Sequence, residues 1–551
     1  MRGTVRPAST VVALTVAVGL AAGPSLPALA SSSGSSGSGK ATVVGATWGD
    51  PNADLAALDL TGRNDPAKDA GSLFTITSAI GAREVWKAHD ATGRAVTGRG
   101  VTVALLDSGL APVPGLDAPG KVVQGPDLSL EANSGLVALD TFGHGTHLGG
   151  IIAAKDLGPV DLKTGEPKAS DPRRQLGVAP DARLLAVKLA TTDGSTDVSQ
   201  VIAALDWVTQ HRNDNGLNVR VVNLSFGTAS VQAYQIDPLA AAAENAWRHG
   251  LVVVVSGGNE GPTAGGLTDP AIDPFVIAVG SSDPQGSPSG WTKNPTVAAY
   301  SSRGTATRHV DLLAPGRSVV SLRDPGSFID VNNPGGRVGG DLTGRLFRGS
   351  GTSQAAAVTS GAVALLLQAF PKLTPDQVKA TLMATATPMP GVPAIDGGAG
   401  QLNISAALTS LRTPSGSKRK APVASKPAVQ TFTAASGAGS LEAARGGYHL
   451  VDATTGVQLA GEVDVQGMPW DGRRWFPTAQ TVASWHGGTW NGAVWTGSSW
   501  TPLGWQNARW GGSSWSSARW SDVSWDSARW SSARWSSAQW DSARWSGNAW
   551  S

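Results

Sequence analysis

A serine lies in this sequence where nucleophilic chemistry is feasible. Ser353 follows the glycine-rich stretch of residues 348–351 and precedes a run of small residues that continues into an apolar segment. A helix beginning here would place unpaired N–H groups and the positive end of its dipole beside a hydroxyl that the turn exposes. Two interpretations are open at this point: Ser353 is a nucleophile, or it belongs to an ordinary Ser/Thr helix cap.

A histidine and an aspartate occur in comparable surroundings. His144 lies between two glycines at the start of a predicted apolar helix, and Asp107 follows the apolar, β-branched run of residues 101–106. A lone histidine here is most simply structural or a metal ligand. His144 and His147 are three positions apart, however, so a His-x-x-x-His zinc pair is absent and no acid completes a metalloprotease helix. Metal binding is therefore the weaker interpretation.

Two more polar turns follow apolar runs. Residues 251–256 lead into a Gly-Gly-Asn turn that ends at Asn259, and residues 219–224 lead into a Ser-Phe-Gly turn that begins at Ser225. Each is compatible with a plain turn. If the preceding runs are parallel strands, their carboxyl ends meet at one edge of the sheet, which is where such sheets bind ligands.

The elements that must position these residues alternate along the chain. Helical stripes at residues 198–211 and 239–249 are interleaved with the apolar runs, and this pattern predicts an α/β fold with a doubly wound parallel sheet and helices on both faces. Helical spacing over residues 76–89, a Thr-Pro-Asp start at Thr374 and residues 402–411 predict three more helices. The predicted strands are residues 101–106, 184–189, 219–224, 251–256 and 275–280.

Taken together, the motifs resemble those of the subtilisin-like serine proteases, the subtilases of peptidase family S8. Their order of Asp, His, Asn and Ser is that of the family, and the likeness covers residues 76–411. The motifs are Asp-Ser-Gly from Asp107, His-Gly-Thr-His from His144, Asn-Leu-Ser-Phe-Gly from Asn223, Ser-Gly-Gly-Asn-Glu-Gly from Ser256 and Gly-Thr-Ser-Gln-Ala-Ala-Ala from Gly351.

The resemblance implies a role for each of four residues. Ser353 would attack the scissile carbonyl, and His144 would take the serine proton and later return it to the leaving amine. Asp107 would hold the imidazole tautomer and stabilise the imidazolium. Asn259 would donate its side-chain amide to the oxyanion, with the backbone N–H of Ser353 as second donor. The implied function is a serine endopeptidase acting through an acyl-enzyme; the alternative is a catalytically silent subtilase fold that binds a surface or cell wall.

The resemblance also implies that protein or peptide substrates bind by strand addition. Glu260 in the pocket would favour basic or polar side chains, although a solvated carboxylate on the rim explains it equally well. Gln354, where the family usually has methionine, should make the site less sensitive to oxidation. The residues expected to bind substrate are Ser225, Phe226, Gly227, Ser256, Gly257, Gly258 and Glu260.

No cofactor is required for this chemistry, and metal ligands are left unassigned. Structural calcium is an expectation from the family alone. The polar stretch of residues 155–175 has four acids that could ligate a hard cation, but a solvated acidic insertion explains them better. These acids are Asp156, Asp161, Glu166 and Asp171.

Composition and the N-terminus indicate the compartment. The chain has no cysteine, which excludes disulfides and thiolate chemistry, and its net charge of +2 gives no support to nucleic-acid binding. Arg2 and Arg6 precede an apolar run over residues 11–22 and a small-residue site ending at Ala30. This run is shorter than the ~20 residues that span a bilayer, so it predicts a cleaved signal peptide, with an uncleaved anchor as the alternative. We expect a secreted protein, extracellular or associated with the cell wall, without a membrane span after cleavage.

The C-terminal tail is a repeat, with a tryptophan at every fifth position from Trp485 to Trp550 and with Trp470 and Trp475 in the same phase. A five-residue step gives no continuous stripe on a helix or a strand, and tryptophans ten apart would share a strand face. A β-solenoid or hairpin ladder with stacked indoles is one interpretation, and an unstructured low-complexity tail is the other. Exposed indoles would suit contact with cell-wall polysaccharide.

These observations predict six segments. Residues 31–75 are too short and too poor in strands for a full propeptide, so we expect folding without a full-length intramolecular chaperone. The segments are a signal peptide (1–30), a Ser/Gly spacer with a short pro-like segment (31–75), the peptidase domain (76–411), a linker (412–430), a small β adaptor (431–480) and the Trp pentad repeat (481–551).

Overall fold

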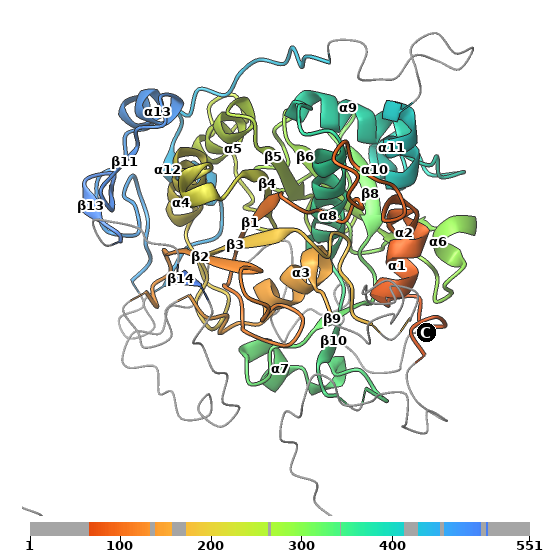
Figure 1. Cartoon of the computed structure of the whole chain (residues 1–551). Helices are drawn as coiled ribbons and strands as arrows, with labels where there is room; N and C mark the ends of the chain where they lie inside the picture. Colours follow the sequence, from red (N-terminus) through yellow and green to blue (C-terminus); the bar gives the residue numbers. More distant parts are fainter. Residues whose placement is uncertain are drawn as a thin grey trace, which may run out of the picture. The chain divides into compact units, whose positions relative to one another are not determined.

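A computed structural model describes most of the chain (Figure 1), and its described residues lie within the compact unit Pro51–Ser551. The predicted signal peptide, most of residues 31–75, most of the linker and all but the first tryptophan pentads lie outside the described part. The described residues are 65–132, 138–156, 172, 174–262, 266–341, 343–412, 428–451, 457–496 and 503–504.

A sheet with the strand order β14-β2-β3-β1-β4-β5-β6-β7 forms the centre, and β8 also pairs with β6. The pairs β14–β2 and β6–β7 are antiparallel, and the other pairs in this sheet are parallel. The strands are β1 (Thr102–Asp107), β2 (Val122–Asp127), β3 (Arg183–Lys188), β4 (Val219–Leu224), β5 (Val252–Ser256), β6 (Ile277–Asp283), β7 (Thr296–Val297), β8 (Leu312–Pro315) and β14 (Leu503–Gly504).

Burial explains why the sequence showed most of these strands. Every residue of β1 and β5 is buried, so both strands are continuous apolar runs, as strands of a parallel sheet covered on both faces must be. The five predicted strands and the α/β fold class are confirmed. Strand β2 was missed because its centre is only half-buried and contains Gly125 and Pro126, which break the apolar pattern. A separate antiparallel pair consists of β9 (Val319–Leu322) and β10 (Leu346–Gly349).

Helices cover the sheet as two packed pairs, α3 with α8 and α4 with α5 (Figure 1). Capping boxes at Asp197 and Thr374 start α4 and α9 where the sequence predicted helices. The helix expected over residues 76–89 is two short helices, because the chain turns at Gly81 with φ of 78°. The longer helices are α1 (Leu73–Ala79), α3 (His144–Ala153), α4 (Val198–His211), α5 (Pro238–Arg248), α8 (Thr352–Ala369), α9 (Pro375–Thr385), α11 (Ile404–Arg412) and α13 (Gly472–Gln480). The shorter ones are α2 (Ala82–Val85), η2 (Asp214–Gly216), α6 (Gly290–Lys293), α7 (Phe328–Asn332), η3 (Pro334–Gly336), α10 (Ala394–Gly397) and α12 (Leu441–Arg445).

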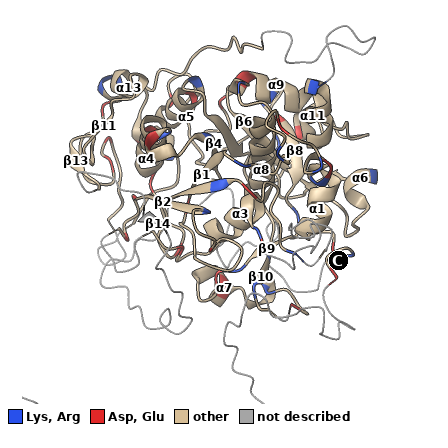
Figure 2. Cartoon of the chain, in the orientation of Figure 1, with Lys and Arg blue, Asp and Glu red and all other residues tan. Residues whose placement is uncertain are grey.

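Charged residues of both signs are interspersed over the helices and loops, as Figure 2 shows. This distribution matches the small net charge of +2. Among the helices in the described part of the chain, none is long and apolar enough to cross a bilayer.

The segment after the linker packs against α4 and α5. Residues 431–480, expected as a small β adaptor, contain the helices α12 and α13, and the β pairing described there consists of isolated bridges such as Val451 with Gln458. The first pentads follow as three two-residue strands, β11 (Trp485–His486), β12 (Thr489–Trp490) and β13 (Ala493–Val494), paired in antiparallel fashion.

The tryptophans described in this region form a buried cluster and not a sugar-binding surface. Because the chain reverses between β11 and β12, Trp485 and Trp490 lie directly opposite each other, so these two consecutive tryptophans share a face. The expectation of exposed indoles is wrong for these five side chains, because three of the indoles bond to α4 and the five rings pack against one another. The exposed fractions are 6% for Trp470, 6% for Trp475, 3% for Trp485, 1% for Trp490 and 8% for Trp495.

Asp206 on α4 anchors this cluster and makes its stability depend on pH. Its Oδ2 atom accepts the indole N–H of Trp475 at 2.7 Å and that of Trp490 at 2.9 Å, and burial raises the pKa of Asp206 to about 6. Between pH ~4 and ~6 the folded state therefore holds more protons than the unfolded state, so stability falls as the pH rises through this window, by about 3 kcal/mol. Asp206→Asn keeps an acceptor oxygen without the charge, and we expect a smaller loss over the same window.

Urea unfolding followed by tryptophan fluorescence at several pH values would measure this difference. Asp214→Asn, at an exposed position on η2, is the matched control and should behave as the wild type. Identical pH dependence in Asp206→Asn and the wild type would contradict the prediction.

Candidate active site

The carboxyl end of β1 delivers Asp107 to His144. Both side chains are buried, and the Nδ1 atom of His144 lies 2.8 Å from Oδ1 and 3.0 Å from Oδ2 of Asp107. Asp107 also accepts the Ser108 N–H at 2.8 Å. A carboxylate facing Nδ1 selects the tautomer whose Nε2, on the opposite side of the ring, can accept a proton.

Two glycines allow His144 to take this position as the first residue of α3. Gly143 precedes the helix with φ of 101°, a left-handed conformation that side chains disfavour. A Cβ at Gly145 would lie 2.1 Å from the carbonyl oxygen of Gly109, so only glycine lets α3 approach the turn after β1. Gly143 before the His-Gly-Thr-His motif and Gly145 within it therefore set the distance between His144 and Asp107.

Asp140 is a second buried carboxylate, and sequence reasoning gave it no role. Its Oδ1 atom accepts the Ser108 hydroxyl and the Gly143 N–H, each at 2.7 Å, and its Oδ2 atom accepts the Thr146 N–H at 2.7 Å. Burial raises the pKa of Asp140. It thus ties the first turn of α3 to the turn after β1. In the sequence, its position as an acid shortly before a predicted helix start could have indicated this role for Asp140.

Ser353 is the second residue of α8, whose residues up to Gln368 are all buried. Its carbonyl oxygen lies 3.5 Å from the Ser225 hydroxyl at the end of β4. The sequence suggested an exposed hydroxyl, but Ser353 has an exposed fraction of 0%. The reason is that α8 runs through the centre of the domain against β4, β5 and β6.

Asn259 is oriented by the residue next to Ser353. Its Oδ1 atom accepts the Thr352 N–H at 2.9 Å and the Thr352 hydroxyl at 3.0 Å. These contacts turn the Nδ2 group the other way, and Nδ2 is buried with no hydrogen-bond acceptor among the residues that the structure describes. A buried, unpaired donor is costly unless a ligand uses it.

The predicted substrate-binding residues form two turns joined by a residue that the sequence did not single out. Thr268 donates its N–H to the Gly257 carbonyl at 3.3 Å, and its side chain occupies the space that a Cβ would need at Gly227 and at Gly258. Ser225, Phe226, Gly227, Ser256, Gly257 and Gly258 are all buried. Glu260 is half-buried, and its N–H donates to the Ser302 hydroxyl at 3.0 Å. The available signal for Thr268 was its place just before the turn that leads into β6.

His147 and Asp156 have protein partners that explain them without a metal. Burial and the neighbouring His144 lower the pKa of His147 to about 3, and its Nε2 lies 3.2 Å from the Phe347 carbonyl. Asp156 pairs with Arg345 at 2.6 Å. Asp161, Glu166 and Asp171 lie outside the described residues, and in the described part no three acidic or histidine side chains are placed to hold a metal ion.

Comparison with known proteins gives the family of this chain. Residues 98–413 match the model of the subtilase family. The chain is 36% identical over 316 residues to serine protease AprX of Bacillus subtilis, a match that covers 56% of this chain and 65% of that relative. It is 30% identical to subtilisin DY of Bacillus licheniformis, over 55% of this chain and 89% of the relative, and 32% identical to subtilisin Savinase of Lederbergia lenta, over 55% and 88%. The chain therefore belongs to the subtilase family of serine-type endopeptidases.

Proposed function

We propose that this protein hydrolyses peptide bonds through an acyl-enzyme, with Asp107, His144 and Ser353 as its catalytic triad. The observation that carries the proposal is the buried contact of both Asp107 oxygens with Nδ1 of His144, at 2.8 and 3.0 Å. The family membership and the position of Ser353 at the start of α8 support it.

The proposed reaction has two halves. The Ser353 oxygen attacks the scissile carbonyl carbon while its proton passes to Nε2 of His144, and collapse of the tetrahedral intermediate breaks the C–N bond as His144 protonates the leaving amine. Water then attacks the carbonyl carbon of the acyl-enzyme and gives its proton to Nε2 of His144. The carboxylic acid leaves as His144 returns this proton to the Ser353 oxygen. Asp107 stays ionised and stabilises the imidazolium in both halves.

Asn259 is the proposed oxyanion donor. A substitution at this residue can distinguish that role from a purely structural one, the positioning of Thr352. Asn259→Asp keeps an oxygen that can accept from Thr352 but replaces the donor by an acceptor. We expect kcat to fall by about 10²–10³-fold with little change in KM, because the donor acts mainly on the oxyanion. Steady-state kinetics would measure this, and an unchanged kcat would show that Asn259 only positions Thr352.

Labelling by a fluorophosphonate probe tests the triad directly, because the reagent reacts with an activated serine. We expect stoichiometric labelling of the wild-type protein. An absence of labelling and of peptide hydrolysis would favour the alternative, a catalytically silent fold used for surface binding. Cleavage of a peptide library by the unlabelled enzyme would then define the preference of the pocket next to Glu260.

Secretion and attachment to the cell wall are further parts of the proposal. The N-terminal charge and hydropathy pattern supports export, and sequencing the N-terminus of the mature protein from culture medium would identify the cleavage site after Ala30. Contact with cell-wall polysaccharide rests on the pentads beyond residue 496, since the five described tryptophans are buried. Sedimentation of the full chain with isolated cell wall would test that contact.

A further inference from the structure

Helix α12 lies against the chain that follows the predicted substrate-binding turn. The Thr228 hydroxyl donates to the Ala444 carbonyl at 2.5 Å, and the Val231 N–H donates to the Ala443 carbonyl at 3.2 Å. Gln232 donates its side-chain amide to the Ser440 carbonyl at 2.8 Å. Backbone groups of the C-terminal segment therefore hold residues 228–232, directly after Gly227.

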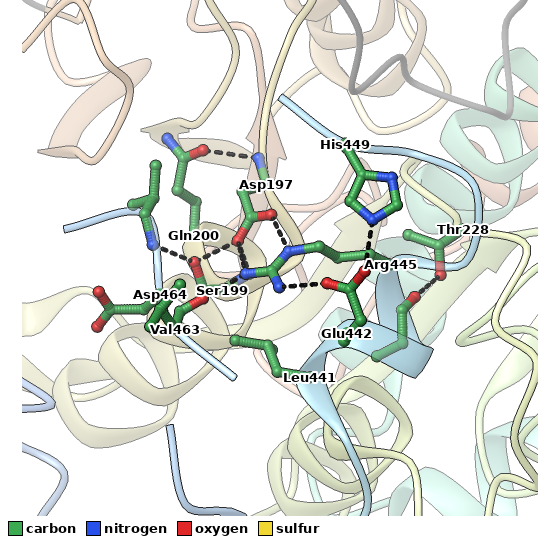
Figure 3. A network of polar contacts seen from close by, with 12 residues as sticks. Asp197, Ser199, Gln200, Thr228, Leu441, Glu442, Arg445, His449, Val463 and Asp464 are labelled. Atoms are coloured by element: carbon green, nitrogen blue, oxygen red, sulfur yellow. Dashed lines mark hydrogen bonds and ion pairs between the residues drawn. The ribbon is translucent and has the colours of Figure 1, made fainter. Parts of the chain in front are cut away.

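Arg445, the last residue of α12, fastens this helix to the peptidase domain (Figure 3). Its Nε atom lies 2.7 Å from Oδ2 of Asp197, and both side chains have an exposed fraction of 0%. Its two terminal nitrogens donate to Glu442 at 3.1 Å, to the Gly461 carbonyl at 2.7 Å and to the Val463 carbonyl. One guanidinium thus joins the N-terminal cap of α4 to α12 and to the loop that follows α12.

Glu442 extends the same network to the surface. It accepts from Nε2 of His449 at 2.8 Å and from the Gly461 N–H at 2.7 Å. The single positive charge of Arg445 therefore lies between two carboxylates, Asp197 on one side and Glu442 on the other. A buried charge with this many fixed partners specifies one geometry, because any shift leaves it unpaired.

The chain that α12 contacts begins close to the proposed nucleophile. Ser225 lies beside Ser353, with 3.5 Å between the Ser225 hydroxyl and the Ser353 carbonyl oxygen. Thr228 directly follows the turn of residues 225–227, and its own backbone N–H and carbonyl pair with Asp269, each at 2.9 Å. Helix α12 therefore supports the chain that leaves the substrate-binding turn.

We propose that Arg445 is a positioning residue for extended substrates: through α12 it holds residues 228–231, and so fixes the turn of residues 225–227 directly before them in the position where a substrate strand pairs with that turn. The inference rests on the proposed endopeptidase function and deepens it. It makes α12 a support of the substrate-binding turn. Strand addition depends on a backbone held in one extended conformation, and α12 supplies the support on one side.

The test compares two substrates in Arg445→Met and Arg445→Lys, with enzyme concentration set by fluorophosphonate titration. For a long internally quenched peptide we expect kcat/KM to fall by about tenfold in Arg445→Met, mainly through KM, because two positioning hydrogen bonds are weakened. For a single-residue ester we expect no change. Arg445→Lys should recover part of the loss, because lysine can pair with Asp197 but cannot also reach two carbonyls. Arg474→Met, at an exposed position on α13, is the matched control and should equal the wild type.

Equal losses on both substrates, or none on the peptide, would overturn the proposal. Since Arg445→Met leaves Asp197 buried without its partner, Thr228→Val provides a second variant that removes only the hydroxyl contact with Ala444. It should show the same selective loss on the peptide, and an unchanged ratio between the substrates would count against the proposal. Hydrogen exchange of the Val231 amide needs no activity: exchange should be faster in Arg445→Met. This readout separates failure of the positioning role from failure of the endopeptidase function.

Discussion

Ser353→Ala should lower kcat for peptide hydrolysis by about 10⁶-fold, the loss seen when the nucleophile of such a triad is removed. Alanine is the best helix former and Ser353 lies in the first turn of α8, so the substitution should leave the fold intact. What remains of the rate would come from substrate binding and the oxyanion donors alone. The measurement is kcat on a peptide substrate, with circular dichroism to confirm folding and fluorophosphonate labelling to confirm loss of the reactive serine.

Ser360→Ala on the same helix is the matched control. The Ser360 hydroxyl donates to Oδ1 of Asn223 at 2.9 Å, so its loss should cost stability of about 1 kcal/mol without changing the labelling. Undiminished labelling or turnover in Ser353→Ala would refute the assignment of the nucleophile and with it the proposed mechanism.

Asp107→Asn should lower kcat by about 10⁴-fold at neutral pH, as the same change does in other Asp-His-Ser triads. An asparagine amide facing Nδ1 donates a hydrogen bond, so the imidazole proton moves to Nε2, which can then no longer accept the proton of Ser353. The effect depends on Asp107 being buried with both oxygens on Nδ1, as the structure has it. The pH dependence of kcat in the variant and the wild type would measure it.

Asp140→Asn separates this chemical effect from a general loss of structure. Asp140 is equally buried but contacts Ser108, Gly143 and Thr146 and not the imidazole. Its substitution should lower stability with a far smaller loss of kcat. If Asp140→Asn and Asp107→Asn lost kcat equally, the tautomer argument would fail.

The peptidase fold does not end at residue 412, because residues 428–496 pack against it. Arg445 pairs with Asp197, and the indoles of Trp475 and Trp490 bond to Asp206, so residues 428–496 share a core with α4. Truncation after residue 412 would expose that surface and leave Asp197 and Asp206 without these partners. The segment therefore belongs to the fold that carries the site, whatever further role the later pentads have.

Local patterns were sufficient to predict the strands β3, β1, β4, β5 and β6 of the sheet and the order of the motifs. Strands such as β1 and β5 are apolar throughout because both of their faces are covered, and helix starts at Asp197 and Thr374 are visible because capping uses neighbouring residues. Thr268 was missed because Gly227 and Gly257 lie in turns that only the fold brings near it. Asp140 was missed although Gly143 and Thr146 are close in sequence, because its bond to Ser108, 32 residues away, is visible only in the fold. The docked face of the tryptophan repeat was missed for the same reason, since the spacing of the indoles does not indicate what covers them.

The sequence by itself determined the residues that can do the chemistry and the family to which they belong, because Asp107, His144, Asn259 and Ser353 each sit in a short motif that needs no distant residue to be recognised. Only the tertiary structure decided how they meet: Asp107 against Nδ1, Asn259 turned by Thr352, and Ser353 buried at the start of α8. It also decided that Arg445 bonds to Asp197, which is 248 residues away along the chain. The physical reason is that distances between remote segments are set by packing of the whole core, whereas motifs, caps and strand patterns are set by near neighbours.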